Sequence, residues 1–135
     1  MATVVITNGS VTIGAVDIST ACSRATWEYG AEAQDETSFG DTTRIMKGGL
    51  KTWSFTVEGN QDFITGSVNA VFFTSVGSTI SCITRQDTGA IAVSNPEYSG
   101  VGLLTEYSPA QLVQGEIQPF RAVFQNAGNL VQTLS

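Results

Sequence analysis

The chain has 135 residues, enough for one domain with a sizeable core, and we expect residues 1–135 to form a single domain. Twelve acidic residues against six basic ones give a net charge of −6, which disfavours binding to nucleic-acid phosphates as the main task. The chain contains no histidine, so the usual general base of an enzyme is missing.

The first predicted element is a β-hairpin. Residues 3–7 and 10–13 are rich in Val, Ile and Thr, and Asn8-Gly9 lies between them. The Asn-Gly dipeptide readily adopts the two positive φ angles of a type I′ turn, so we expect it to join two strands.

Two later segments, residues 24–29 and 52–58, alternate between apolar and polar side chains. Such alternation predicts strands with one buried and one exposed face. We expect the aromatic side chains to pack in the core. The apolar face of the two segments carries Ala25, Trp27, Tyr29, Trp53, Phe55 and Val57.

Residues 30–50, between these strands, show no sustained period. A compact domain seldom carries so long an irregular loop unless the loop is functional or becomes ordered on binding. The only predicted helix spans residues 66–76, where Val68, Val71, Phe72 and Val76 are spaced for one face.

The remaining segments resemble strands separated by Gly, Pro and Asn; they are residues 79–85, 97–107, 116–124 and 130–134. Seven or eight short strands with one flanking helix and a long inter-strand loop indicate an all-β fold, a β-sandwich.

Cys22 and Cys82 have no metal-ligand spacing, so we expect neither a metal nor a cofactor. We interpret both as small buried apolar side chains, with a disulfide as the alternative. No stretch approaches the roughly 18 apolar residues of a membrane span, and the first residues lack the features of a secretory signal. We therefore expect a soluble intracellular chain.

Motifs of nucleophilic, phosphate-binding or zinc-dependent enzymes are missing from the sequence, and we expect no enzymatic activity. Asp35-Glu36 could form a carboxylate pair, and Asp41 with Asp62 could bind a metal. An exposed, solvated loop explains these acids without a site, and we favour that interpretation.

Charge is distributed unevenly along residues 28–51. One interpretation is a solvated loop with a local ion pair. The other is that acidic and basic parts meet opposite parts on other copies, in a head-to-tail contact that forms rings or filaments. Phe39 and Met46 would then be apolar anchors. Five acids come first and three bases follow: Glu28, Glu32, Asp35, Glu36 and Asp41, then Arg44, Lys47 and Lys51.

Several short segments follow one another in a recognisable order, which as a set resembles major tail tube proteins of long, non-contractile-tailed bacteriophages over residues 11–109. The segments are Asp17-Ile18-Ser19, Trp27-Glu28-Tyr29, Gly40-Asp41-Thr42-Thr43-Arg44, Gly48-Gly49-Leu50-Lys51, Trp53, Asn60-Gln61-Asp62-Phe63, Ser67-Val68-Asn69-Ala70 and Asn95-Pro96-Glu97-Tyr98.

The resemblance implies a β-sandwich whose subunits form hexameric rings, stacked into a hollow tube through which the genome passes during ejection. It implies that the long loop reaches neighbouring subunits and is mobile before assembly. The implied location is the virion tail, assembled in the host bacterial cytoplasm. Implied partners are further copies of the chain, the tail tip or initiator, the terminator, the tape measure and assembly chaperones. DNA would be passing cargo, and no membrane would be involved.

In such a tube, acidic and hydroxyl side chains facing the lumen would repel DNA phosphates. If residues 24–29 and 52–58 pair, their polar faces supply the lumen-facing candidates, with Arg24 as an exception on the same face. The candidates are Thr26, Glu28, Thr52, Ser54, Thr56 and Glu58.

Two rival functions stay open on the sequence. One is another virion component, such as a tail terminator or a capsid decoration protein. The other is a carbohydrate-binding β-sandwich module that uses Trp27 or Trp53.

Overall fold

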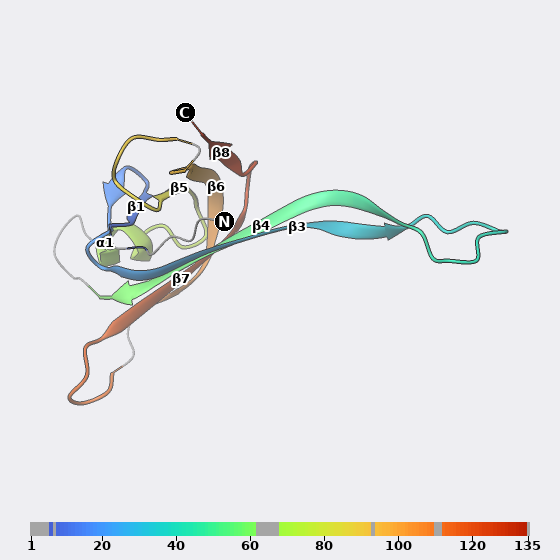
Figure 1. Cartoon of the computed structure of the whole chain (residues 1–135). Helices are drawn as coiled ribbons and strands as arrows, with labels where there is room; N and C mark the ends of the chain where they lie inside the picture. Colours follow the sequence, from blue (N-terminus) through green and yellow to red (C-terminus); the bar gives the residue numbers. More distant parts are fainter. Residues whose placement is uncertain (1–5, 7, 62–67, 93, 110–111, 135) are drawn as a thin grey trace.

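The computed structural model describes residues 6, 8–61, 68–92, 94–109 and 112–134. Within this part of the chain, eight strands and one short helix form a body from which a long ribbon projects (Figure 1). In chain order they are β1 (Ser10–Ile13), β2 (Val16–Asp17), β3 (Cys22–Asp35), β4 (Met46–Asn60), α1 (Val68–Phe73), β5 (Thr79–Arg85), β6 (Glu97–Ser108), β7 (Pro119–Asn126) and β8 (Val131–Thr133).

The strands belong to one antiparallel sheet. Their order is β2-β1-β5-β6-β7-β4-β3, and β8 pairs with β6 off this path. The sheet folds back on itself, because Trp27 on β3 and Thr84 on β5 are hydrogen-bonded although three strands lie between them in the order. The predicted all-β fold with a single helix is confirmed.

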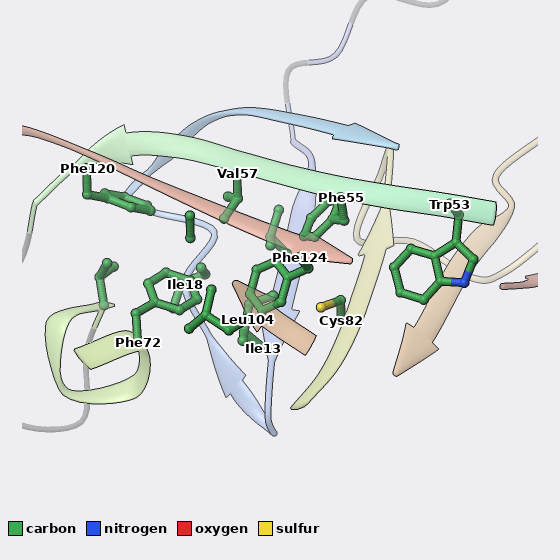
Figure 2. Close-up of a cluster of buried hydrophobic side chains, with 13 residues drawn as sticks. Ile13, Ile18, Trp53, Phe55, Val57, Phe72, Cys82, Leu104, Phe120 and Phe124 are labelled. Atoms are coloured by element: carbon green, nitrogen blue, oxygen red, sulfur yellow. The ribbon is translucent and has the colours of Figure 1, made fainter. Parts of the chain in front are cut away.

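The core fills the space between the two halves of this folded sheet (Figure 2). Four phenylalanines are the largest of its fully buried side chains, and Phe72 of α1 packs against Phe120 and Phe124 of β7 with ring centroids 5.8 and 5.9 Å apart. Burying each such ring contributes about 1.5–3 kcal/mol to folding. The buried apolar residues are Val11, Ile13, Ile18, Trp53, Phe55, Val57, Val68, Phe72, Cys82, Leu104, Phe120, Ala122 and Phe124.

The first hairpin differs from the prediction. Most of residues 3–7 lies outside the described part, Gly9 lacks the positive φ of a type I′ turn, and Asn8 forms an isolated parallel bridge with Asp87. The tight turn lies instead at Gly14-Ala15, where φ is 56° and 71°, and it joins β1 to β2. Both central residues therefore have the positive φ that a type I′ hairpin requires, without the Asn-Gly signal.

The helix is shorter than predicted. Residues 66–67 lie outside the described part, and α1 ends at Phe73, three residues before the expected end. A turn then leads to Gly77, whose φ is 85°. Val68 and Phe72 are buried and Val71 packs against the core, as predicted, but Val76 lies beyond the helix and is 50% exposed.

The long irregular loop expected over residues 30–50 is a further correction. β3 continues to Asp35 and β4 begins at Met46, so only residues 36–45 connect them. The outer parts of both strands lie beyond the body, where neither face is buried. Alternation of apolar and polar residues reports one buried face, so a strand exposed on both faces carries no such pattern.

Candidate functional site

A two-stranded ribbon, residues 30–51, extends away from the body; we call it the arm (Figure 1). Every residue of the arm is exposed except Gly49, which is half-buried. No described part of the body covers the arm, so its side chains are available to other molecules.

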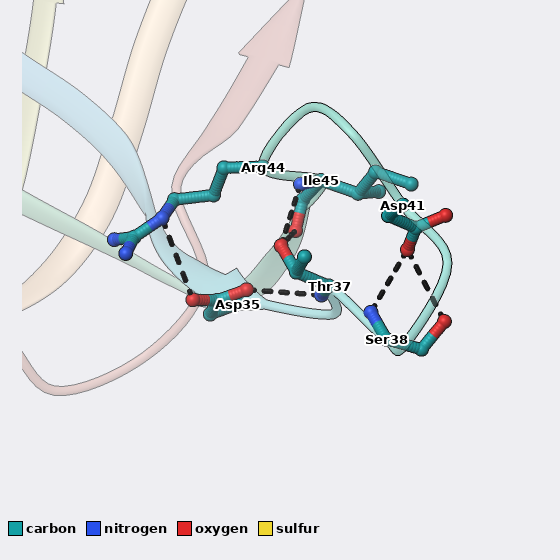
Figure 3. A network of polar contacts seen from close by, with 6 residues as sticks. All are labelled: Asp35, Thr37, Ser38, Asp41, Arg44 and Ile45. Atoms are coloured by element: carbon teal, nitrogen blue, oxygen red, sulfur yellow. Dashed lines mark hydrogen bonds and ion pairs between the residues drawn. The ribbon is translucent and has the colours of Figure 1, made fainter.

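The tip of the arm is held by its own hydrogen bonds (Figure 3). The Thr37 hydroxyl accepts from the Ile45 N–H at 2.8 Å, and the Asp41 carboxylate accepts from the Ser38 N–H at 2.8 Å. Asp35 accepts from the Thr37 N–H at 2.9 Å. Hydrogen bonds from the side chain and backbone of Thr37 lower the pKa of Asp35 below its ordinary value. Asp35 is therefore ionised at neutral pH and is not poised as a proton donor.

Among the charged residues of the arm, the structure brings only one oppositely charged pair together. Arg44 Nε lies 3.8 Å from Asp35 Oδ2, with both side chains well exposed. Such a pair contributes little to stability. Lys47 and Lys51, on β4 opposite Gln34 and Ala31, form no ion pair with any described residue. The arm thus contains one local ion pair and, on β4, two lysines that pair with no described acid.

Exposed apolar side chains also mark the arm. Phe39 at the tip is fully exposed, and Met46 is half exposed. Their role as anchors stays a prediction. Glu36 is exposed as well. Sequence reasoning missed Leu50, which is 81% exposed. Leu50 could have been noticed as an apolar residue in a segment that does not alternate like a strand with one buried face.

Two indole rings fix the root of the arm to the body. Trp27 Nε1 donates to Thr84 Oγ1 at 2.7 Å, and Trp53 Nε1 donates to the Gly128 carbonyl at 2.8 Å. Trp27 stacks on Phe55 with centroids 4.3 Å apart, and Trp53 is 4% exposed. Core packing, rather than a carbohydrate platform, is therefore the role of both rings. The expectation is wrong for the rest of that face of β3, because Tyr29 is 57% exposed and Ala25 is exposed as well.

The six lumen candidates share one face of the β3–β4 ribbon, away from Trp27 and Phe55. Across the two strands, Thr26 opposes Thr56, Glu28 opposes Ser54, Arg24 opposes Glu58, and Thr52 opposes Gly30. The face continues onto β7 and β6, because Glu58 opposes Arg121, Thr56 opposes Val123, and Val123 opposes Glu106. We call this four-stranded surface of β3, β4, β7 and β6 the polar face.

Ion pairs cross the polar face. Arg121 Nε lies 3.2 Å from Glu58 Oε1, and Arg121 Nη1 lies 3.4 Å from Glu106 Oε1. Sequence reasoning identified Glu58 but missed Arg121 and Glu106. A polar residue at every second position of a strand would have indicated them, but this alternation is weak in β6 and β7.

The described residues offer no metal site, disulfide or membrane-spanning helix. Among the described residues, no three His, Cys, Asp or Glu side chains cluster in a way that could hold a metal ion. Asp62, offered with Asp41 as a metal ligand, lies outside those residues. Both cysteines are free, so the disulfide alternative is wrong. Over the same part of the chain, no helix has the length and apolarity needed to cross a membrane.

No protein-family model matches this chain, and no curated protein matches it in sequence. Solved structures do match it in fold. The SPP1 tail tube aligns with a TM-score of 0.68 at 9% identity, over 93% of this chain and 77% of that one.

Two further structures extend the comparison. The tail of an empty gene transfer agent particle, refined with C6 symmetry, aligns with a TM-score of 0.63 at 18% identity, over 84% of this chain and 82% of that one. Hcp1 from Flavobacterium johnsoniae aligns with a TM-score of 0.53 at 14% identity, over 94% of this chain and all of the other. The chain therefore has the fold of the phage tail tubes, as the sequence resemblance implied.

Proposed function

We propose that this chain is a structural virion protein, which self-assembles into stacked hexameric rings that form the hollow tail tube through which phage DNA passes. The observation that carries the proposal is the arm. A two-stranded ribbon on its own is marginally stable in water, and this one exposes Phe39, Met46 and Leu50. Neighbouring subunits that cover the arm would bury these side chains and stabilise the ribbon.

The charge distribution suits the same role. The polar face presents hydroxyls and carboxylates over four strands, and Glu58 and Glu106 hold Arg121 between them. If this face lines the lumen, few unpaired cations would meet the phosphates of passing DNA, so the DNA can slide. Six subunits per ring is the number expected from the C6 symmetry of the gene transfer agent tail.

The partners proposed for the chain are further copies of itself, together with the tail tip or initiator, the terminator, the tape measure and assembly chaperones. DNA is non-specific cargo, and no catalytic step belongs to this function. The proposed location is the virion tail, with assembly in the cytoplasm of the host bacterium.

Negative-stain electron microscopy of the concentrated protein tests the proposal. We expect long hollow tubes, with light scattering that keeps rising as tubes elongate. Growth that stops at single rings would favour a tail terminator. Protein that stays monomeric at all concentrations and salt levels, even after seeding with tail tips, would contradict self-assembly.

A further inference from the structure

A row of alternating charges crosses the polar face from β3 to β6, directly across the first three strands and diagonally from Arg121 to Glu106. Arg24 on β3 opposes Glu58 on β4, and Glu58 opposes Arg121 on β7. Glu106 on β6 completes the row through its ion pair with Arg121. The signs are therefore plus, minus, plus and minus from one edge of the four strands to the other.

The cation at one end of the row is unpaired. Arg24 forms no ion pair with any residue that the structure describes, although Glu58 opposes it across the strand pair. β3 is the last strand of the sheet order, so the edge that carries Arg24 has no strand partner in the described part of the chain. A cleft of about 700 Å³ lies along this edge and separates it from β1 and β5.

The anion at the other end also lies at an open edge. β6 pairs with β5 only as far as Leu103, so the following residues through Ser108 have no described strand on that side. Glu106 lies in this stretch, and its side chain is 61% exposed. The four-stranded surface thus ends in a positive residue on one edge and a negative residue on the opposite edge.

Strand directions allow the two edges to meet. Each neighbouring pair from β3 through β4 and β7 to β6 is antiparallel, so β3 and β6 run in opposite directions. A second copy related by rotation would bring its β6 edge beside β3 in antiparallel orientation. Such a head-to-tail contact repeats identically around a closed ring.

We propose that Arg24 of one subunit pairs with Glu106 of the next, and that this contact sets the lateral register of the subunits within a ring. The inference rests on the proposed tube function and assigns a residue pair to it. It also accounts for Arg24, the single unpaired cation among the described residues of an otherwise hydroxyl-rich and acidic face. Around the ring, the alternation of charge then continues without a break.

Two charge-reversed variants test the pairing. Arg24→Glu brings two carboxylates together at every contact, and Glu106→Arg brings two guanidinium groups together. Like charges placed opposite one another cost several kcal/mol, so each variant alone should need a protein concentration more than about ten-fold higher to assemble. Mixed in equal amounts, the variants can alternate around an even-numbered ring, where every contact joins opposite charges. The mixture should assemble near the wild-type concentration.

Glu106→Arg also places a cation beside Arg121, so a cycle of neutral variants provides a second measurement. Arg24→Gln and Glu106→Gln should each raise the critical concentration about two- to five-fold, and the double variant should raise it no further. Additive effects, or single reversals that assemble like wild type, would overturn the pairing while leaving the tube intact. Failure of the wild-type protein to assemble would instead overturn the proposed function, and the pairing with it.

Discussion

The indole N–H of Trp27 donates a hydrogen bond to the hydroxyl of Thr84 over 2.7 Å and joins two strands that are far apart in the sheet order. Trp27 lies on β3 near the root of the arm, and Thr84 lies on β5 in the other half of the folded sheet. Because the donor is half-buried, losing the acceptor leaves an N–H group without full compensation from water. This contact therefore holds the root of the arm against the body.

Replacing Thr84→Val keeps the shape of the side chain and removes the acceptor. We expect the free energy of unfolding to fall by about 1–2 kcal/mol, measured by urea denaturation. Thr79→Val on the same strand changes an exposed residue and should alter stability by less than about 0.5 kcal/mol. Equal effects of the two substitutions would contradict a specific role for the Trp27 bond.

Because Gly100 has no side chain, the Trp53 ring can pack directly against its backbone. A Cβ at this position would lie 2.8 Å from Cζ2 and 3.1 Å from Cη2 of the indole. Gly100→Ala should therefore displace the ring, cost about 1–3 kcal/mol and shift the tryptophan fluorescence. Gly30→Ala, where the added methyl group meets nothing within 4 Å, is the matched control. An unchanged spectrum in Gly100→Ala would show that the ring is held less tightly than its contacts indicate.

Phe39 separates stability from assembly. Its ring contacts solvent on all sides, so Phe39→Ala should leave the free energy of unfolding of the monomer unchanged within about 0.5 kcal/mol. If the ring is a buried anchor in the tube, truncation should raise the critical concentration about 30-fold or more. Thr42→Ala, at another exposed position of the tip, should assemble normally. Wild-type assembly by the Phe39 variant would remove this residue from the contact.

Reversing the charge of Arg44 and Lys47 tests whether the bases of the arm contact neighbouring subunits. We expect Arg44→Glu with Lys47→Glu to block polymerisation, because both positions would then repel the acidic surface of a neighbouring subunit. The circular dichroism spectrum should stay that of the folded monomer. Exchanging the two bases, Arg44→Lys with Lys47→Arg, preserves charge and should preserve tubes. Unchanged tube yield after reversal would leave only the apolar side chains as anchors.

Both cysteines make stability sensitive to high pH. Burial raises the pKa of the Cys82 thiol from 9.0 to about 12, and burial with a smaller effect of Asp17 raises that of Cys22 to about 12. The folded state thus holds these protons more tightly than the unfolded state. Their contribution is complete below pH 9 and is lost as pH rises from about 9 to 12, by up to about 1.4 kcal/mol per pH unit for Cys82 and by less for Cys22, which solvent partly screens.

Urea denaturation at pH 7, 9 and 10.5 measures this effect. The double variant Cys22→Ala/Cys82→Ala removes both thiols and keeps every other titratable group. It should therefore lose less stability than wild type between pH 9 and 10.5. Identical losses would show that the thiols do not contribute.

Strands that bury one face were predictable, and strands that bury none were not. Residues 52–58 alternate because Trp53, Phe55 and Val57 enter the core, and Trp27 of the paired strand packs against them while its neighbours stay exposed. The outer halves of the same strands lack alternation, so the arm was predicted as an irregular loop. The uneven distribution of charge, together with Phe39 and Met46, nevertheless singled out this segment in the sequence.

Contacts between segments distant in sequence were the second feature that the sequence did not predict. The Gly14-Ala15 turn contains no strong turn signal, and its geometry is fixed where the Gly14 N–H donates to the Ser81 carbonyl at 2.9 Å. Likewise, Arg121 and Glu106 join Glu58 on one surface only through the order of β4, β7 and β6. Strand order depends on contacts between distant segments, which local patterns do not encode.

The arm also has a kinetic consequence for a growing polymer. Because no described residue of the body pairs with the ribbon, its backbone amides should exchange with deuterium through local opening, independently of the body. Each incoming subunit would have to order its arm against a surface made by several earlier subunits. The first few additions lack that surface, so assembly should begin with a lag that a preformed end abolishes. The same feature that exposes the arm would then keep free subunits in reserve until a template is present.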